Sequence, residues 1–368
     1  MERNSWSPAM KLLIVTVPYP PYIGGTAEHS YQLAVGLSRL GHDVTVSTIV
    51  PPSSVPRRLS SLPWPGLINV LRFRALTPLL PGFSPGHASN FKSTKDDYGA
   101  VINIGYDSML ALQTAVIGHP RMMFISLFHG LSGSSRQRHA IHKLLKPFNR
   151  IMFRNAKIIV CGSKYEASLV QISFPDATAK IRIVRPGITR LIPPRTSRRE
   201  TKRILDISML HQFKGVQDIL RALPLLPEHV LDVVGEGPYM KVLQSISQSL
   251  GIADRVAFHG VVTEAEKMAL LRDASVFVHL SRMESYSLVV GEALAAGLPC
   301  VVLKSNALAE WVDGMACFGI EAPIHPPVLA DTILRAENSI TLKRLPTWGE
   351  YAKNIEQLLV EISGLQKG

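Results

Sequence analysis

The chain of 368 residues is about twice the usual length of one domain, so two domains are expected. Its hydrophobic residues (46%) and charged residues (18%) are in the proportion of a globular protein and exclude a disordered or fibrous chain. The net charge of +12 lies in the first half, because residues 1–186 carry 21 basic and 8 acidic residues, whereas residues 187–368 carry 19 and 20.

The three cysteines lie far apart, with no CxxC pair and no histidine cluster at ligand spacing, so neither a disulfide framework nor a structural zinc site is expected. A reducing cytosol fits this cysteine content. The opening run KLLIVTV is too short for the apolar region of a signal peptide and predicts a first buried strand. No eighteen uninterrupted apolar residues occur, so we expect no bilayer-spanning helix.

Strand-like runs alternate with amphipathic helical patterns from the start of the chain. KLLIVTV is followed by the helical pattern AEHSYQLAVGLSRLG and by a second run, HDVTVSTIV. Further runs of the same kind in the first half are AVIN, MMFISLF, KIIVCGS and RIVRPG. Short β-branched runs separated by helical patterns of about ten to fifteen residues predict βαβ units and a parallel sheet.

Residues 60–90 interrupt this alternation with an irregular stretch in which Pro, Trp and Phe are interleaved with Arg72 and Arg74. The stretch is too long and too apolar for a plain solvated loop. Two interpretations stay open. It is either a mobile acceptor lid or interfacial anchor, or a loop that packs on its own domain.

A basic stretch follows. No acidic residue occurs between Ser108 and Tyr165, and this part of the chain predicts a face that attracts an anionic surface. Its basic residues recur at near-helical spacing, at Arg136, Arg138, Lys143, Lys146, Arg150 and Arg154.

The join between the domains is expected in IVRPGITRLIPPRTSRRET, where prolines, serines and basic residues break the pattern. Beyond it the strand-like runs return as RILDISML, VLDVVG, RVAFHG, SVFVHLS and CVVL. The second half therefore repeats the organisation of the first, and we predict two doubly wound α/β domains.

The segment RMESYSLVVGEALAAG places two carboxylates, Glu284 and Glu292, among apolar and small residues. An unpaired buried carboxylate costs several kcal/mol, so each needs a partner. The partner is either a protein cation or a ligand. A helix that begins near Ser287 and stops at Gly297 would place free N–H groups at Ser287 and Leu288, in an arrangement suited to phosphate.

The spacing of the two carboxylates suits a nucleotide-sugar. Glu284 precedes the expected helix start, and Glu292 lies about 7 Å beyond it along the helix axis. The two side chains could therefore bind hydroxyl groups on either side of a diphosphate.

The segment that begins at Asp273, DASVFVHLSRMESYSLVVGEALAAGLPCVV, resembles the E-x7-E motif of family 4 glycosyltransferases. Eight other motifs of the chain also resemble family motifs and occur in the family's order. They are PYPPYIGGTAEHSYQLAVGLSRLGHDVTV, FHG, VCGSKYE, VRPGI, KGVQDILRAL, LDVVGEGP, RVAFHGVV and PTWGEYAKNIEQLL. The resemblance covers nearly the whole chain. It implies the GT-B architecture, in which two Rossmann-like doubly wound domains face each other across a cleft.

The resemblance also implies the domain boundaries. Residues 1–186, joined by a C-terminal helix at about 348–368, correspond to the acceptor-binding domain. Residues 187–347 correspond to the donor-binding domain, which holds the nucleotide-sugar.

Site residues follow from the resemblance position by position. Glu292 matches the family glutamate that accepts hydrogen bonds from the ribose hydroxyls, and Glu284 matches the one that holds hydroxyls of the transferred sugar, a catalytic role. Ser287 and Leu288 match the helix start whose amides meet the diphosphate.

Four more residues complete this expected site. Gly24 and Gly25 approach the diphosphate from the first domain, where a missing Cβ lets the backbone come near a ligand. Lys214 matches the lysine that neutralises the leaving diphosphate, and His129 matches the catalytic histidine at the sugar face of the cleft.

The chain departs from the family pattern at three places. Met209, in SMLHQFKG, occupies the place of the family's arginine, a cation that faces the diphosphate. Ser287 occupies the place of a glycine, and Pro186 and Gly187 replace an Asn-Gly pair. A catalytically impaired paralogue that serves as a partner or regulatory subunit therefore stays open as an alternative, as does a sugar-nucleotide epimerase.

For the main interpretation, the resemblance implies a retaining glycosyltransferase that needs no metal ion and no cofactor, with a nucleotide-sugar donor. The basic first half favours a glycan or lipid-linked acceptor at an anionic membrane surface, in glycan or glycolipid biosynthesis. We expect a cytoplasmic protein with peripheral contact to the inner membrane face. No recognised nucleic-acid module accompanies the basic charge, so no nucleic-acid partner is expected.

Overall fold

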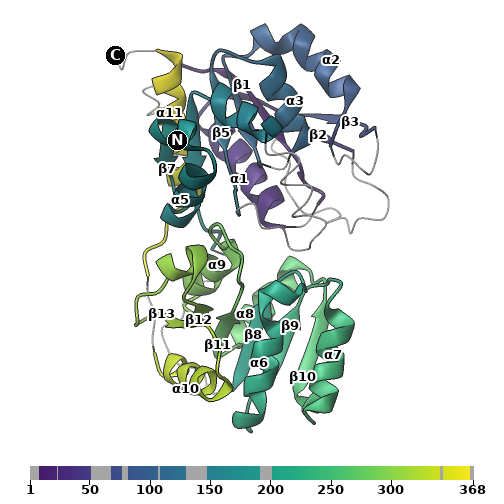
Figure 1. Cartoon of the computed structure of the whole chain (residues 1–368), viewed down its shortest axis with the longest axis vertical. Helices are drawn as coiled ribbons and strands as arrows, with labels where there is room; N and C mark the ends of the chain where they lie inside the picture. Colours follow the sequence, from purple (N-terminus) through teal and green to yellow (C-terminus); the bar gives the residue numbers. More distant parts are fainter. Residues whose placement is uncertain are drawn as a thin grey trace. The chain divides into compact units, whose positions relative to one another are not determined.

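A computed structural model describes residues 8–22, 24–50, 68–76, 82–106, 108–129, 147–190, 201–339 and 343–364. The chain divides into two compact units, of which unit 1 comprises residues 1–187 and 346–368 and unit 2 comprises residues 188–345. Each unit contains a parallel sheet flanked by helices (Figure 1). The prediction of two doubly wound α/β domains is thereby confirmed.

In unit 1 the sheet order is β3-β2-β1-β4-β5-β6-β7, and every described pair of neighbouring strands is parallel. The strands are β1 (Lys11–Thr16), β2 (Asp43–Ile49), β3 (Ile68–Phe73), β4 (Ala100–Ile104), β5 (Met122–Ile125), β6 (Ile158–Cys161) and β7 (Ile181–Ile183). Five of the six residues of β1 are buried, because helices cover both faces of the sheet, which is why its sequence is continuously apolar.

The helices of unit 1 are α1 (Gly25–Arg39), α2 (Pro85–Thr94), α3 (Met109–Ile117), α5 (Lys164–Ser173) and α11 (Trp348–Ser363), and residues 147–155 are also helical. The C-terminal α11 packs on unit 1, where Tyr351, Ile355 and Leu359 share a buried core with Leu33 and Leu37 of α1.

One expectation about unit 1 is corrected. The stretch at residues 60–90, expected to be irregular, contains the edge strand β3 and the helix α2. Among the described strands, β3 pairs with β2 alone, and it is only half-buried, so its sequence INVLRF lacks the continuous apolar run of an inner strand. Residues 51–67 and 77–81 lie outside the described residues, and the lid, anchor and packed-loop interpretations are untested there.

In unit 2 the sheet order is β10-β9-β8-β11-β12-β13, again with parallel neighbours. The strands are β8 (Arg203–Ile207), β9 (Val230–Val234), β10 (Val256–Gly260), β11 (Val276–His279), β12 (Cys300–Leu303) and β13 (Cys317–Ile320). The helices are α6 (Val216–Ala222), α7 (Met240–Ser249), α8 (Glu264–Asp273), α9 (Leu288–Ala295) and α10 (Pro326–Glu337).

The strand order of unit 2 reverses direction between β8 and β11. In open parallel sheets, ligands bind beyond the carboxyl ends of the strands at such a reversal. None of the helices described is both long enough and apolar enough to cross a membrane.

Candidate functional site

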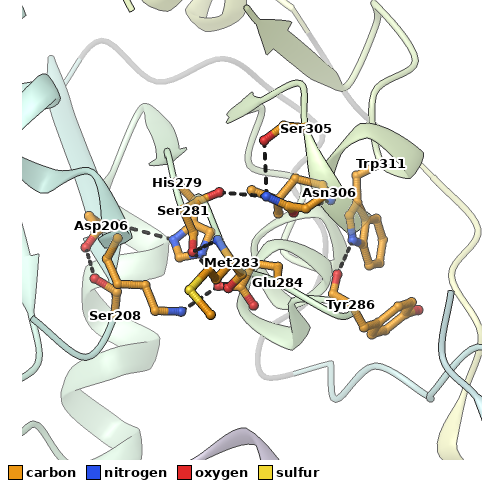
Figure 2. A network of polar contacts seen from close by, with 12 residues as sticks. Asp206, Ser208, His279, Ser281, Met283, Glu284, Tyr286, Ser305, Asn306 and Trp311 are labelled. Carbon is orange, nitrogen blue, oxygen red and sulfur yellow. Dashed lines mark hydrogen bonds and ion pairs between the residues drawn. The ribbon is translucent and has the colours of Figure 1, made fainter. Parts of the chain in front are cut away.

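Two buried polar side chains stand near the carboxyl ends of the strands at this reversal. Asp206 lies in β8 and His279 ends β11, and these strands are neighbours in the sheet. His279 Nδ1 lies 3.4 Å from Asp206 Oδ1, and the Ser208 hydroxyl donates to Asp206 Oδ2 at 2.6 Å. Figure 2 shows His279 between Asp206 and Glu284, whose Oε1 lies 3.0 Å from His279 Nε2.

Lys214 completes this network. It ends the short 3-10 turn η3 (Gln212–Lys214), and its Nζ lies 2.5 Å from Glu284 Oε1. The next residue, Gly215, has φ of 82°, and a Cβ built there would lie 2.5 Å from the carbonyl oxygen of Leu280. Only glycine therefore lets the Lys214 turn lie this close to the segment after β11.

The electrostatics of the network favour a charged carboxylate. Burial alone would raise the pKa of Glu284, but the charge of Lys214 and the contacts with His279 outweigh it and hold that pKa well below its usual range. For His279, burial lowers the pKa, yet the hydrogen bonds to Asp206 and Glu284 together raise it above its ordinary value. The geometry thus pairs an ionised Glu284 with the Lys214 cation and with a histidine whose charged form is favoured by both neighbouring carboxylates.

Helix α9 begins at Leu288, directly after Ser287. Ser287 adopts φ of 75°, a left-handed conformation that glycine takes most easily, at the position where the resembled family has glycine. Its hydroxyl is buried and has no hydrogen-bond partner among the described residues. The helix start therefore offers free amide groups beside an unsatisfied hydroxyl, an arrangement that can bind an anion.

Glu292 lies in α9 and is buried. Its Oε2 lies 2.6 Å from the Nζ of Lys267, which belongs to α8. The small residues around Glu292 serve packing, since a Cβ on Gly291 would collide with the Ile188 side chain. Both carboxylates of the apolar segment therefore have protein cations as partners, although a ligand can still compete for them.

The loop that carries Glu284 is braced from a neighbouring segment (Figure 2). Trp311 Nε1 donates to the carbonyl oxygen of Tyr286 at 2.6 Å, and Asn306 Nδ2 donates to that of Ser281 at 3.0 Å. These bonds hold the loop near β11 and support the position of Glu284.

In unit 1, Gly24 precedes α1 with φ of 146°, and Gly25 is the first residue of that helix. His129 is exposed and follows the buried Phe128. The Phe128 N–H donates to the buried Glu166 carboxylate at 2.7 Å, which fixes the backbone next to His129. Burial raises the pKa of Glu166 to about 7, although three hydrogen bonds to the carboxylate oppose the shift.

The structure brings together five of the expected site residues, all in unit 2. Lys214 contacts Glu284, whose loop leads to Ser287, Leu288 and, one turn further, Glu292. Gly24, Gly25 and His129 belong to unit 1. The departure at Met209 directly follows Ser208, which contacts Asp206, and the residue is 63% exposed.

Asp206, His279 and Lys267 are site residues that the sequence motifs did not indicate. The available indication was a polar residue in each of two otherwise apolar strand runs, RILDISML and SVFVHLS. Two polar residues near the carboxyl ends of adjacent parallel strands are candidates for a site. Among the described residues, no group of three His, Cys, Asp or Glu side chains could hold a metal ion.

Comparisons with known proteins match both halves of the chain to family models. A model described as Glycosyltransferase Family 4 matches residues 23–190, and one described as Glycosyl transferases group 1 matches residues 189–355. A glycogen synthase of Mycobacterium tuberculosis is 26% identical over 84% of this chain and 82% of its own length. A GDP-mannose-dependent alpha-(1-6)-phosphatidylinositol monomannoside mannosyltransferase of Mycolicibacterium smegmatis is 28% identical over 49% of this chain and 54% of its own.

Solved structures show the same fold. Sucrose-phosphate synthase from Thermosynechococcus elongatus superposes with a TM-score of 0.74 at 19% identity, covering 97% of this chain and 96% of that one. Anabaena HepE, solved in complex with UDP-glucose, superposes with a TM-score of 0.66 at 18% identity, covering 96% and 97%.

Proposed function

The chain belongs to the family 4 glycosyltransferases of the GT-B fold, which transfer sugars from nucleotide donors, and we propose that it does so with retention of configuration and without a metal ion. The acceptor in this proposal is a lipid-linked or cell-surface glycan precursor at the cytoplasmic face of a membrane. Unit 2 holds the donor and unit 1 the acceptor.

The observation that carries the proposal is the contact of Lys214 with Glu284 beside the start of α9. The cation and the free amides of Ser287 and Leu288 supply positive charge for a diphosphate. Glu284 supplies an acceptor for sugar hydroxyls, and Glu292 supplies one for the ribose. By the resemblance, Gly24 and Gly25 are assigned in this proposal to the diphosphate and His129 to the sugar.

The environment of Glu284 supports retention without a covalent intermediate on this residue. Its negative charge is already stabilised by Lys214 and by the contact with His279, and its pKa is held well below the usual range, so it is a weak nucleophile. In the proposed mechanism the leaving phosphate departs from the face that the acceptor attacks and helps to deprotonate the acceptor hydroxyl. Glu284 orients the sugar, and Lys214 with the helix amides replaces a divalent ion.

The acceptor is proposed from charge and from one relative. Residues 1–186 carry a net charge of +13, which suits an anionic lipid surface. The mannosyltransferase of Mycolicibacterium smegmatis, by its name, acts on a phosphatidylinositol monomannoside. A polyanionic or lipid-linked acceptor for this chain is consistent with both.

A thermal-shift screen of nucleotides and nucleotide-sugars, including UDP-glucose and GDP-mannose, tests the donor site. We expect one nucleotide and its sugar conjugate to raise the melting temperature. We expect Glu284→Gln and Lys214→Ala to lower sugar transfer by about 100-fold. Glu321→Gln and Lys304→Ala are matched controls, because that ion pair is exposed on the surface.

Other outcomes would favour the alternatives. No shift with any nucleotide would count against a donor site. Free sugar formed without any acceptor would favour an epimerase. Unchanged transfer by a reconstituted partner enzyme after Glu284→Gln would favour the impaired paralogue, for which Met209 is the structural argument.

A further inference from the structure

Lys214 and His279 contact the same carboxylate oxygen of Glu284. Lys214 Nζ lies 2.5 Å from Glu284 Oε1, and His279 Nε2 lies 3.0 Å from that same atom. Within the described ranges of the chain, Oε2 accepts no hydrogen bond. A carboxylate that is held through one oxygen presents the other in a fixed direction, as an acceptor for a ligand hydroxyl.

These two partners of Glu284 differ in how firmly they are held. The side chain of His279 is 1% exposed, and its second ring nitrogen contacts Asp206, which also accepts the hydrogen bond from Ser208 (Figure 2). Lys214 lies on a short turn, with its side chain 17% exposed. The imidazole of His279 is therefore held in place at the carboxyl ends of the strands, whereas the ammonium group of Lys214 can turn towards a ligand.

Donor binding would draw the two partners apart. In the proposed function Lys214 serves the diphosphate, and a lysine that turns to a phosphate gives up part of its contact with Glu284. A buried carboxylate left without a cation is strongly unfavourable. His279 is the partner that remains in place.

We infer that His279 is a positioning residue of the donor site, which, as an imidazolium held by Asp206, keeps Glu284 ionised and aims its Oε2 at a hydroxyl of the transferred sugar. The inference rests on the proposed function of Glu284 and adds the residues that orient it. His279 itself contacts neither sugar nor phosphate in this role.

The charged groups that face His279 set the pH dependence. They are Asp206 from β8, Glu284 from the loop after β11 and Lys214 from η3. Burial lowers the pKa of His279, and the two carboxylates outweigh it and raise the pKa above 6.5. The protonated form is therefore favoured relative to that of a free histidine, and its contribution is lost as the pH rises through the raised pKa.

The first experiment compares His279→Gln and His279→Leu with the wild-type chain. The assay follows release of nucleoside diphosphate from UDP-glucose or GDP-mannose, whichever raises the melting temperature. Gln retains an N–H donor without the charge, so we expect kcat of His279→Gln to fall about 10-fold. Leu has neither donor nor charge, so we expect kcat of His279→Leu to fall about 100-fold. We expect affinity for UDP or GDP alone to change less than twofold, because Glu284 addresses the sugar.

The control is His259→Gln. His259 Nε2 lies 2.8 Å from Asp232 Oδ1 on strands β10 and β9, so it is a histidine–aspartate pair that does not touch Glu284. We expect this variant to match the wild-type chain in kcat.

The second experiment follows the protonation of His279 by NMR of the ¹⁵N-histidine-labelled chain, with Asp206→Asn as the variant. We expect a pKa above 6.5 in the wild-type chain. The variant should have a lower pKa, because it loses one of two carboxylate partners. The loss of kcat at rising pH should move to lower pH in parallel.

The outcomes separate the inference from the proposed function. A wild-type chain that binds no nucleotide-sugar overturns both. A wild-type chain that turns over its donor, with His279→Leu equally active or with the pH profile unmoved in Asp206→Asn, overturns the inference alone. A His279 that is mostly neutral at pH 6.5 in the ligand-free protein also overturns the inference alone.

Discussion

Glu284 and Glu292 are two negative charges in an apolar helix-start segment, and each is compensated within unit 2. Glu284 contacts Lys214 and His279, and Glu292 contacts Lys267. A buried ion pair contributes little net stability by itself, whereas removal of one partner leaves a buried charge and is strongly destabilising. At the scale of single residues, stability thus depends on whether each charge of the site keeps its partner, more than on the number of charges.

The Lys267–Glu292 pair leads to a stability prediction. Lys267→Met should lower the free energy of unfolding by about 3 kcal/mol, because Glu292 would lose its cation while buried. The control, Lys304→Met, removes a pair whose side chains are both more than half exposed, and should cost less than about 1 kcal/mol. Urea unfolding measures both values, and equal losses in the two variants would contradict the interpretation of a buried pair.

Ser287 has a strained backbone at the helix start. Its φ of 75° favours glycine, so Ser287→Gly should raise the free energy of unfolding by about 1 kcal/mol. Ser287→Ala removes the unpaired hydroxyl but keeps the strain, and should be close to the wild-type chain in melting temperature. If Ala stabilises as much as Gly, the backbone conformation is not the cause.

Met209 is the third residue whose replacement is informative. It is exposed and directly follows Ser208, at the place where the resembled family has a cation. Met209→Arg should increase affinity for UDP or GDP about threefold to tenfold, since one more positive charge would face the diphosphate. Met209→Gln, which adds polarity without charge, is the control, and calorimetric titration compares them. Equal affinities of the two variants would show that position 209 does not face the diphosphate.

At the scale of elements, short backbone distances decide how segments pack. α1 and α11 approach so closely that a Cβ on Gly36 would lie 2.6 Å from the Cβ of Ala352. In the same way Gly215 lets η3 approach the segment after β11 and places Lys214 at Glu284. The site geometry therefore depends on glycines outside the charged residues themselves.

The contact of α1 with α11 can be tested by Gly36→Ala. Alanine favours a helix by up to about 1 kcal/mol over glycine, yet we expect a net loss of about 2 kcal/mol because the two helices must separate. Gly349→Ala is the control in the first turn of α11, where the nearest atom to an added Cβ is 3.9 Å away. Thermal unfolding should show a lower melting temperature for the first variant only. A gain in stability from Gly36→Ala would refute the close packing.

At the scale of the whole molecule, the charge is unevenly distributed along the chain. Residues 1–186 have a net charge of +13, and residues 187–368 have a net charge of −1. We therefore expect residues 1–186, and not residues 187–368, to be attracted to an anionic surface.

Sedimentation with lipid vesicles tests this asymmetry. We expect vesicles rich in phosphatidylserine to retain the chain at about 50 mM salt and to release it at about 500 mM, because salt screens the attraction. Replacing Arg136, Arg138, Lys143 and Lys146 by Gln, at positions outside the described residues, should abolish retention. The control replaces Lys241, Arg272, Lys304 and Arg335 of the second half. Equal retention by neutral phosphatidylcholine vesicles would rule out an electrostatic contact.

Local sequence patterns determined the class of fold and the positions of the two carboxylates of the proposed donor site. Apolar runs of strand length and helical periodicity are properties of neighbouring residues, so they predict two parallel α/β units. The same patterns failed at β3, because an edge strand is buried on fewer sides and its sequence resembles a loop. The two carboxylates of E-x7-E could also be located from the sequence, because both lie in one continuous segment.

The partners of those carboxylates were decided by the tertiary structure alone. Lys214 lies 70 residues from Glu284, and Asp206 lies 73 residues from His279. They meet because β8 and β11 are neighbours in the sheet, although β9 and β10 stand between them in the chain. Strand order arises from the packing of whole elements, and no local periodicity specifies it. The sequence therefore located the charges, and the order of the strands determined which charges neutralise one another.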